Sequence, residues 1–349
     1  MKITSRKYES PAGEITVYKV VNPSGAWVEL SSLGAGVLGV GVPDRDGKIE
    51  NVALAYANPA DYMADGPCLG KCPGRYANRI AAGHLQVDGK IYQLEVNNGP
   101  NHLHGGSNGF QNKIWESREL PDGVEFSYLS KDGEADYPGN LKVTATYRWS
   151  DDNVLTLHFH AVSDADTVVN LTNHSYWNLK GADAGTVLRH EMKIQAEKWL
   201  PTDSTLIPTG ELADVRDTPM DFREWKEVGK EINADFPALK FGKGYDNCWA
   251  IDGWRKGRMS EGAVQLRDAE SGRLLTVDSD QPGVQVYSGN WLAGCPANHS
   301  GRSYEDYDGV AIEMQGFPDA PNQPNFPSQL LREREDYDRT IRFAFSIDK

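Results

Sequence analysis

The sequence contains few cysteines and no long apolar run. Its 349 residues include 4 cysteines, which form no Cys-x-x-Cys motif and are too sparse for a disulfide scaffold. No segment approaches the roughly 18 consecutive apolar residues of a membrane-spanning helix. Residues 1–10 lack an apolar stretch, so we expect no signal peptide. We therefore expect a cytoplasmic protein with reduced thiols at Cys68, Cys72, Cys248 and Cys295.

Positive charge is also scarce. The chain has 36 Lys and Arg residues against 50 Asp and Glu residues, which gives a formal net charge of −14 at pH 7. A protein with this charge repels phosphate backbones and anionic lipids. We therefore expect neither nucleic acid nor a membrane surface as a partner.

Helical periodicity is rare, whereas turn-forming residues and strand-like alternation are frequent. The chain contains 35 Gly and 19 Pro residues. Together they make up a larger share of the sequence than the roughly 12% found in an average protein. Asp88-Gly89 within residues 85–92 predicts a β-hairpin with a type I′ turn. Short helices are predicted at residues 58–63 and 221–229. The pattern as a whole predicts one antiparallel all-β domain over residues 1–349. The alternation is clearest in residues 15–20, 124–129, 141–149, 154–162 and 341–347.

Residues 34–39 match the G-x-G-x-x-G pattern of dinucleotide-binding proteins. That pattern holds a pyrophosphate where a strand precedes it and a helix follows it. Here Val40-Gly41-Val42-Pro43-Asp44 follows, which is a second strand-like run ending in a turn. We therefore expect no nucleotide cofactor at this segment.

Two loop-like segments combine glycine and asparagine with basic or imidazole side chains. They are residues 74–80, Gly-Arg-Tyr-Ala-Asn-Arg-Ile, and residues 97–106, Asn-Asn-Gly-Pro-Asn-His-Leu-His-Gly-Gly. Binding and catalytic residues concentrate on such loops. The alternative is that these side chains only form turns and solvated surface.

A third segment, residues 168–179, places five hydrogen-bonding side chains on one face if the chain is extended there. Such a face suits a polar cleft, and the alternative is a strand facing solvent. The five are Asn170, Thr172, His174, Tyr176 and Asn178.

A fourth segment, residues 309–321, is strand-like and carries Glu313 among apolar residues. Val310, Ile312 and Met314 would point into a core. A carboxylate in so apolar a strand is costly unless it has a partner or a role. Burial raises the pKa of a carboxyl group and makes it a stronger base. The alternative is a structural ion pair between Glu313 and an arginine such as Arg79.

These segments resemble the signatures of the aldose 1-epimerase (galactose mutarotase) family, in the family's order, and the resemblance runs from about residue 10 to the C-terminus. It implies an all-β fold, a large antiparallel β-sandwich of the galactose mutarotase-like supersandwich type. The segments that carry it are residues 74–80, 97–106, 171–176, 206–211, 244–246, 285–290 and 313–318.

The resemblance also implies an activity and the residues that perform it. Family members interconvert the α and β anomers of a free aldose such as D-galactose or D-glucose. His174 would be the general acid at the ring oxygen, Glu313 the general base at the C1 hydroxyl, and His104 a second catalytic histidine. The residues implied to bind the sugar are Asn78, Arg79, His104, Tyr176, Asp246 and Gln285.

Opening and closing a cyclic hemiacetal requires proton transfers and no redox step, so we expect no cofactor and no metal. The expected partner is a neutral monosaccharide, which the negative charge of the chain does not repel. We expect a monomer or a weak homodimer. Four positions depart from the residues commoner in the family, and we expect them to alter the walls of the site: Trp177, Asn247, Trp249 and Gly316.

Four alternatives remain open at this point. A glycoside hydrolase needs two carboxylates, which Asp246 and Glu313 could supply. A sugar-binding module could keep the fold without catalysis, although it would need neither His174 nor Glu313. A metal enzyme could use His102 with His104, or His158 with His160. A sugar-6-phosphate epimerase would need several convergent cations, which we cannot assign.

Overall fold

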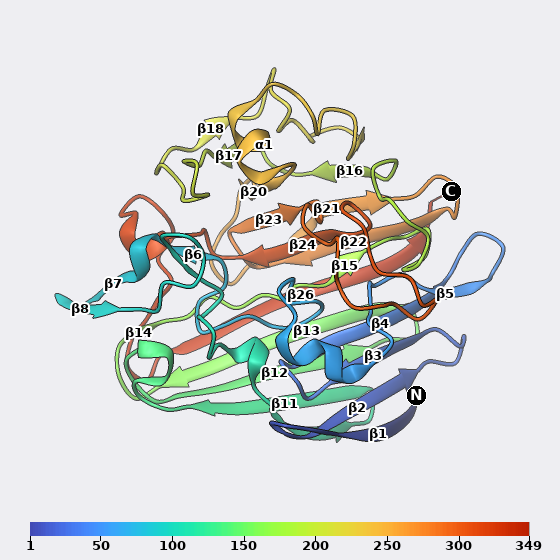
Figure 1. Cartoon of the computed structure of the whole chain (residues 1–349), viewed down its shortest axis with the longest axis horizontal. Helices are drawn as coiled ribbons and strands as arrows, with labels where there is room; N and C mark the ends of the chain where they lie inside the picture. Colours follow the sequence, from blue (N-terminus) through green and yellow to red (C-terminus); the bar gives the residue numbers. More distant parts are fainter. Residues whose placement is uncertain (349) are drawn as a thin grey trace.

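A computed structural model describes residues 1–348, and their regular structure is almost entirely β-strand (Figure 1). This confirms the all-β prediction; the last residue of the expected domain lies outside the described residues. Among these residues there is one α-helix, α1 (Pro237–Gly242). No helix within residues 1–348 is long and apolar enough to cross a membrane. Five short 3₁₀ helices are η1 (Pro59–Ala64), η2 (Ala81–Gly83), η3 (Phe110–Asn112), η4 (Glu134–Asp136) and η5 (Ala320–Asn322).

The largest sheet of the described chain has nine antiparallel strands, and the C-terminal strand β26 lies in its middle (Figure 1). Buried and partly exposed residues alternate strictly along β13. This confirms the strands predicted near residues 124–129, 141–149, 154–162 and 341–347. In spatial order the strands are β10 (Glu116–Leu120), β11 (Gly123–Ser130), β12 (Leu141–Trp149), β13 (Val154–Ser163), β26 (Asp336–Ile347), β22 (Arg273–Ser279), β21 (Ser260–Arg267), β16 (Glu191–Ile194) and β19 (Lys226–Glu227).

A six-stranded sheet carries the candidate site, and a five-stranded sheet is formed by the N-terminal part of the chain. The six strands in spatial order are β15 (Tyr176–Trp177), β24 (Val310–Gln315), β23 (Gly283–Tyr287), β20 (Asp246–Ala250), β17 (Lys198–Leu200) and β18 (Ala213–Asp214). The five are β1 (Lys2–Ser10), β2 (Gly13–Val21), β3 (Trp27–Ser31), β4 (Gly36–Pro43) and β5 (Ile49–Asn51).

Three two-stranded pairs complete the strands of the described chain. The β7–β8 pair is the predicted hairpin: Val87 pairs with Lys90, and both turn residues have positive φ, as a type I′ turn requires. The pairs are β6 (Arg79–Ile80) with β9 (His102–Leu103), β7 (His84–Val87) with β8 (Lys90–Gln93), and β14 (Thr167–Val168) with β25 (Leu330–Leu331).

One large buried core receives side chains from all three main sheets, for example Val28, Leu157 and Ile312. Such shared burial fixes the six-stranded sheet relative to the other two, because each apolar face is covered by another sheet. Val310, Ile312 and Met314 of β24 all belong to this core, as their spacing predicts. The opposite face of β24 is therefore available for a site.

Two helix predictions have different outcomes. Residues 58–63 do form a helix, η1, which Asn58 caps by accepting a hydrogen bond from the Ala60 N–H. The helix predicted at residues 221–229 is wrong, since this segment forms turns and the short strand β19. Its apolar residues Phe222 and Val228 are buried in the core in this irregular conformation. At residues 34–39 the chain turns and enters β4 instead of a helix, as expected.

Candidate active site

Strand register gathers one group of polar side chains on a single face of the six-stranded sheet. Glu313 lies opposite Gln285, and Tyr287 lies opposite Asp246. On the other side Tyr176 pairs with Ala311, and the same antiparallel register continued by two residues brings His174 opposite Glu313. Residues that are paired, or two apart along a strand, share a face. The face therefore carries Tyr176, Tyr287, Asp246, His174, Glu313 and Gln285.

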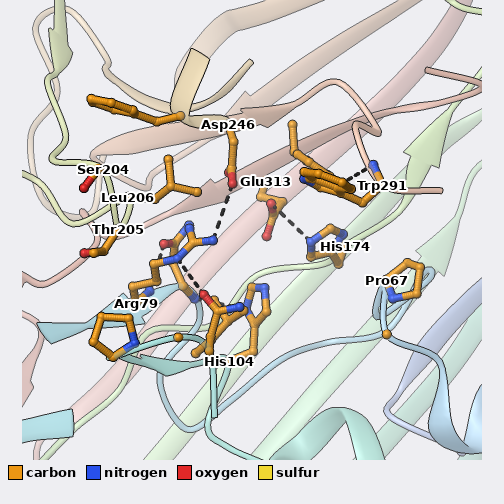
Figure 2. Close-up of a pocket in the computed structure, with 18 of the residues that line it drawn as sticks. Pro67, Arg79, His104, His174, Ser204, Thr205, Leu206, Asp246, Trp291 and Glu313 are labelled. Atoms are coloured by element: carbon orange, nitrogen blue, oxygen red, sulfur yellow. Dashed lines mark hydrogen bonds and ion pairs between the residues drawn. The ribbon is translucent and has the colours of Figure 1, made fainter. Parts of the chain in front are cut away.

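His174 and Glu313 form a buried pair at the centre of this face (Figure 2). The His174 Nε2 atom lies 3.5 Å from Glu313 Oε1, and the two residues are 5% and 2% exposed. Within residues 1–348, the remaining polar atoms, His174 Nδ1 and Glu313 Oε2, make no hydrogen bond. The alternative, an ion pair between Glu313 and Arg79, does not form. Instead, the Arg79 Nη2 atom lies 3.5 Å from Asp246 Oδ2, and Arg79 Nε donates a hydrogen bond to Asn98 Oδ1.

Burial shifts the pKa values of this pair in opposite directions. Desolvation raises the pKa of Glu313 well above its usual range, the negative charge of Asp246 adds to this, and Arg79 opposes it. Desolvation lowers the pKa of His174 to about 4. These shifts favour the form in which a single proton shared by the pair is on the carboxyl group and the imidazole is neutral. Transfer of that proton from the carboxyl to the imidazole creates a base and an acid side by side.

Loops supply the side of the cleft that faces the sheet. Asn78 and His104 both have left-handed main-chain conformations, with φ of 68° and 54°, and asparagine adopts this conformation more readily than most residues. The two residues bind each other: the Asn78 N–H donates to His104 Nδ1 over 3.1 Å, and the His104 N–H donates to the Asn78 carbonyl over 3.1 Å. Arg79 then follows in β6, which pairs with β9 next to His104.

The bond from Asn78 determines the tautomer of His104. Because Nδ1 accepts a hydrogen bond from a main-chain N–H, the proton of the neutral ring must be on Nε2. Burial lowers the pKa of His104 well below its usual value, and the neighbouring His174 lowers it further, so the ring is neutral. The His104 ring lies 5.4 Å from the His174 ring. His104 therefore presents a neutral N–H donor beside the proposed acid.

Between the sheet and these loops lies a cleft of about 590 Å³, a volume typical of small-molecule sites. Seven of the residues predicted for the site line this cleft: Asn78, Arg79, His104, His174, Tyr176, Asp246 and Glu313. Gln285 does not. It lies behind Asp246 and donates from Nε2 to Asp246 Oδ1 over 2.6 Å, so it orients that carboxylate.

The prediction for residues 168–179 is partly wrong. Of the five polar side chains assigned to one cleft-facing side, His174 and Tyr176 line the cleft. Asn170 donates to the Ala77 carbonyl, and Asn178 donates to the carbonyls of Gly185 and Asp308. The segment is irregular up to β15, because it passes between loops whose main-chain groups need partners.

The four positions expected to alter the walls do not line the cleft. Trp177 and Trp249 belong to the buried core, Asn247 is fully buried, and a side chain at Gly316 would overlap Gln329. Sequence reasoning instead missed residues that do line it. Trp291 and Phe241 are exposed at the rim, and a large aromatic residue in the Gly289-Asn290-Trp291 loop was the available signal. Gly66, Pro67, Ser204 and Thr205 were missed as well, whereas Asn98, Leu206 and Tyr287 lie in segments that the resemblance had singled out.

Within residues 1–348, three side chains in the cleft lie close enough together to bind one metal ion. One atom from each of His104, His174 and Glu313 lies within 4.8 Å of the other two. His104 fits poorly, because its cleft-facing nitrogen carries the proton fixed by Asn78. The other histidine pairs do not converge: His102 bonds to the Glu95 carbonyl and the Tyr137 hydroxyl. His158 and His160 bond to aspartates on the exposed face of the nine-stranded sheet.

Comparison with known proteins agrees with this geometry. The family model described as aldose 1-epimerase matches residues 16–344. The galactose mutarotase of Homo sapiens is 42% identical over 340 residues, covering 97% of each chain. The aldose 1-epimerase of Escherichia coli (strain K12) is 36% identical over 327 residues, covering 93% of each chain. A crystal structure of an aldose epimerase homologue from C. elegans superposes with a TM-score of 0.87 at 31% identity, over 99% of this chain and 100% of that one.

Proposed function

Since the chain belongs to the aldose 1-epimerase family, we propose that its cleft interconverts the anomers of a free aldose such as D-galactose or D-glucose, with His174 and Glu313 as acid and base. The protein is an isomerase, so the hydrolase and non-catalytic alternatives are not retained. The observation that carries the assignment of the two residues is their buried contact, 3.5 Å between Nε2 and Oε1.

Ring opening uses the form of the pair in which Glu313 is a carboxylate and His174 an imidazolium. Glu313 removes the proton of the C1 hydroxyl, and His174 protonates the ring oxygen as the bond from C1 to that oxygen breaks. The products are an open-chain aldehyde, a protonated Glu313 and a neutral His174. Rotation about the C1–C2 bond presents the other face of the aldehyde, and the two proton transfers run backwards. Each positioned proton transfer is worth about 10²–10⁴ in rate.

Of the charges next to the pair, Arg79 favours the reactive form. It lowers the pKa of Glu313 and so favours the carboxylate, whereas Asp246 raises the pKa values of both His174 and Glu313. Arg79 thus offsets part of the desolvation that favours the neutral form. Arg79 and Asp246 also face the cleft, where they hold sugar hydroxyls together with Asn78, Tyr176 and the His104 Nε2–H.

The charges of the cleft suit a neutral sugar. Among its lining residues in the described chain, Arg79 is the one Lys or Arg, and it pairs with Asp246. A phosphate group needs several unpaired cations or main-chain donors. We therefore propose a free aldose as substrate in place of a sugar phosphate. We also propose that the reaction uses no cofactor and no metal, because every step is a proton transfer or a bond rotation.

We further propose that the chain is one domain, located in the cytoplasm, and a monomer or a weak homodimer. The single large core shared by the three main sheets supports one domain. All four cysteines are buried and none is bridged, which suits a reducing compartment. Light scattering after size-exclusion chromatography measures the oligomeric state.

Polarimetry tests the proposed activity. Freshly dissolved α-D-galactose and α-D-glucose are followed at low temperature, with active and with heat-inactivated protein. We expect the active protein to accelerate relaxation to an unchanged final rotation, and the ratio of the two rates to report the preferred sugar. Relaxation at the blank rate for both sugars, and for L-arabinose, D-xylose and L-fucose as well, would contradict the proposed function.

A further inference from the structure

A buried ion pair that the mechanism does not use lies next to the candidate site. The side chains of Lys71 and Asp65 are 1% and 0% exposed and contact each other directly. Lys71 Nζ also donates to the Tyr62 carbonyl over 2.7 Å, and Asp65 Oδ2 accepts from the Leu69 N–H over 2.6 Å. Taking two charges out of water is expensive, and a buried ion pair is weak evidence for stability. The position of the pair therefore points to a role other than stability.

The ion pair joins the two ends of a loop, residues 65–71, that holds the main chain of His174. The Gly70 N–H donates to the His174 carbonyl over 2.9 Å, and the His174 N–H donates to the Lys71 carbonyl over 2.9 Å. The same loop binds the residues on either side of His174. Asn173 Nδ2 donates to the Gly70 carbonyl, and the Tyr176 hydroxyl donates to the Pro67 carbonyl.

The loop is also fixed from its other side. Gly70 has φ of +70°, and a Cβ there would lie 1.9 Å from the Val37 carbonyl oxygen of β4. The Val37 N–H donates to the Gly70 carbonyl over 2.8 Å. The loop is thus held between β4 and the His174 segment, and the ion pair closes it.

The charge of Lys71 acts on the same imidazole. It lowers the pKa of His174, against the effect of Asp246, which raises it. The Lys71 ammonium is neutralised by Asp65, so the field at His174 depends on both members of the pair. The titratable and charged groups that face the His174 ring are His104, Tyr176, Tyr287, Glu313, Asp246 and Lys71.

We propose that the Asp65–Lys71 ion pair is a positioning device for His174: it closes the loop that holds both main-chain groups of His174, and it balances the charge behind the imidazole. Neither residue lines the cleft. The inference rests on the proposed role of His174 as the acid, and it adds two positioning residues that act through His174.

Single substitutions of the pair have opposite electrostatic signs, which allows a sharp test. In Lys71→Met the positive charge is lost, so we expect the pKa of His174 to rise. In Asp65→Asn the ammonium loses its counter-charge, so we expect the pKa of His174 to fall. In both variants we expect kcat to fall roughly 10- to 100-fold with KM changed less than about threefold, as for a displaced catalytic group.

Lys226→Met is a matched control. Lys226 is also buried, and its ammonium also donates to a main-chain carbonyl, that of Pro219 over 2.7 Å, and to a carboxylate, that of Glu231 over 2.8 Å. The charged groups that act on its pKa, Glu231, Asp221 and Lys230, all lie outside the cleft. We expect Lys226→Met to lower the melting temperature and to leave kcat and the pKa of His174 at their wild-type values.

The measurement is an NMR titration of the His174 imidazole in the full-length protein, combined with polarimetry on the same samples. Opposite shifts in Lys71→Met and Asp65→Asn support the proposal. Unchanged kcat and pKa in both folded variants, or shifts of equal sign, would overturn it. If one single variant fails to fold, the double variant Asp65→Asn/Lys71→Met removes both charges, and a wild-type kcat in it would equally overturn the proposal. Absence of mutarotation in the wild type refutes the proposed function instead, because the NMR shifts are read without turnover.

Discussion

The two sides of the cleft are built in different ways. On the sheet side, hydrogen-bonded neighbours set the positions of Glu313 and Gln285, and the same register continued places His174. On the loop side, Asn78 and His104 occupy left-handed conformations and bind each other's main chain. The sheet side carries the proposed proton-transfer pair together with Asp246 and Tyr176, whereas the loop side carries only proposed hydroxyl-binding groups. In this proposal the chemistry depends on the sheet alone, and recognition draws on both supports.

The largest effect is expected on the sheet side. Glu313→Gln keeps the shape of the side chain and removes the base, so we expect kcat to fall at least about 10²-fold with a small change in KM. Polarimetric progress curves over a range of galactose concentrations measure both. Glu270→Gln, at a carboxylate 71% exposed, is the control. Turnover within a few-fold of wild type in Glu313→Gln would remove Glu313 from the reaction.

His174→Asn is expected to have a similar or slightly smaller effect. It deletes the acid, while the main-chain bonds to Gly70 and Lys71 can remain, so kcat should fall by about 10² and sugar affinity should persist. Combining it with Glu313→Gln should add little, because groups that act as a unit are not additive. His158→Asn on the exposed sheet is the control. Loss of affinity at normal turnover would make His174 a binding residue.

The next largest effect on activity is expected from a change of pH, which alters the protonation of the His174–Glu313 pair on the sheet side. The pair works with one shared proton: at low pH a second proton blocks the base, and at high pH loss of the shared proton removes the acid. The shifts favour a one-proton form with a protonated carboxyl group and a neutral imidazole. The acid limb of kcat/KM should therefore follow the pKa of His174, which burial lowers to about 4, and the alkaline limb should follow the raised pKa of Glu313. Below the acid limb, activity should fall about tenfold per pH unit. An acid limb at or above the ordinary histidine pKa near 6.5 would contradict this.

On the loop side, Arg79→Lys should raise KM about five- to tenfold and lower kcat less. Lysine keeps the charge near Glu313 but cannot bond to Asn98 and Asp246 in the geometry of the guanidinium. Polarimetric rates over a range of sugar concentrations give kcat and KM separately. If Arg79→Lys lowered kcat as much as Glu313→Gln does, the loop side would also take part in the chemistry, and the contrast between the two sides would not hold.

The smallest effect is expected at the rim. Trp291 is 64% exposed and stacks on the Lys243 ammonium, 4.2 Å from the ring centroid. Trp291→Ala should raise KM for a monosaccharide by no more than about threefold, because an exposed ring loses little contact. Phe241→Ala, at the other exposed aromatic residue that lines the cleft, is the companion variant. A larger change in kcat than in KM would place Trp291 in the chemistry.

The sheet side was largely predictable from the sequence, and the loop side was not. Alternation in β24 already separated Glu313 from the core residues Ile312 and Met314, because period-2 burial is a local property of a strand. Asn78 and His104 follow no period. Their left-handed conformations arise from contacts between loops distant in the sequence, so a family resemblance was needed to bring them together.

Two of the three errors have the same origin. Residues 221–229 were predicted as a helix, but burial of Phe222 and Val228 by distant strands holds them in turns. The exposed Trp291 was missed because its place depends on the loop after β23. Tertiary contacts decided both of these positions. Helix α1 was missed for a different reason: it has six residues and starts at Pro237, too short for a periodic signal.

The location of the acid and the base beside Trp177 has a consequence for heat inactivation. Trp177 lies three residues after His174 in the chain and pairs with Val310 of β24, and its ring contacts the rings of Phe343 and Phe345 of the nine-stranded sheet. Active-site segments are often the first to loosen on warming. Here the proposed proton-transfer pair is attached to the large buried core, so we expect its geometry to persist until that core melts. Loss of turnover and loss of the fold should therefore occur at one and the same temperature.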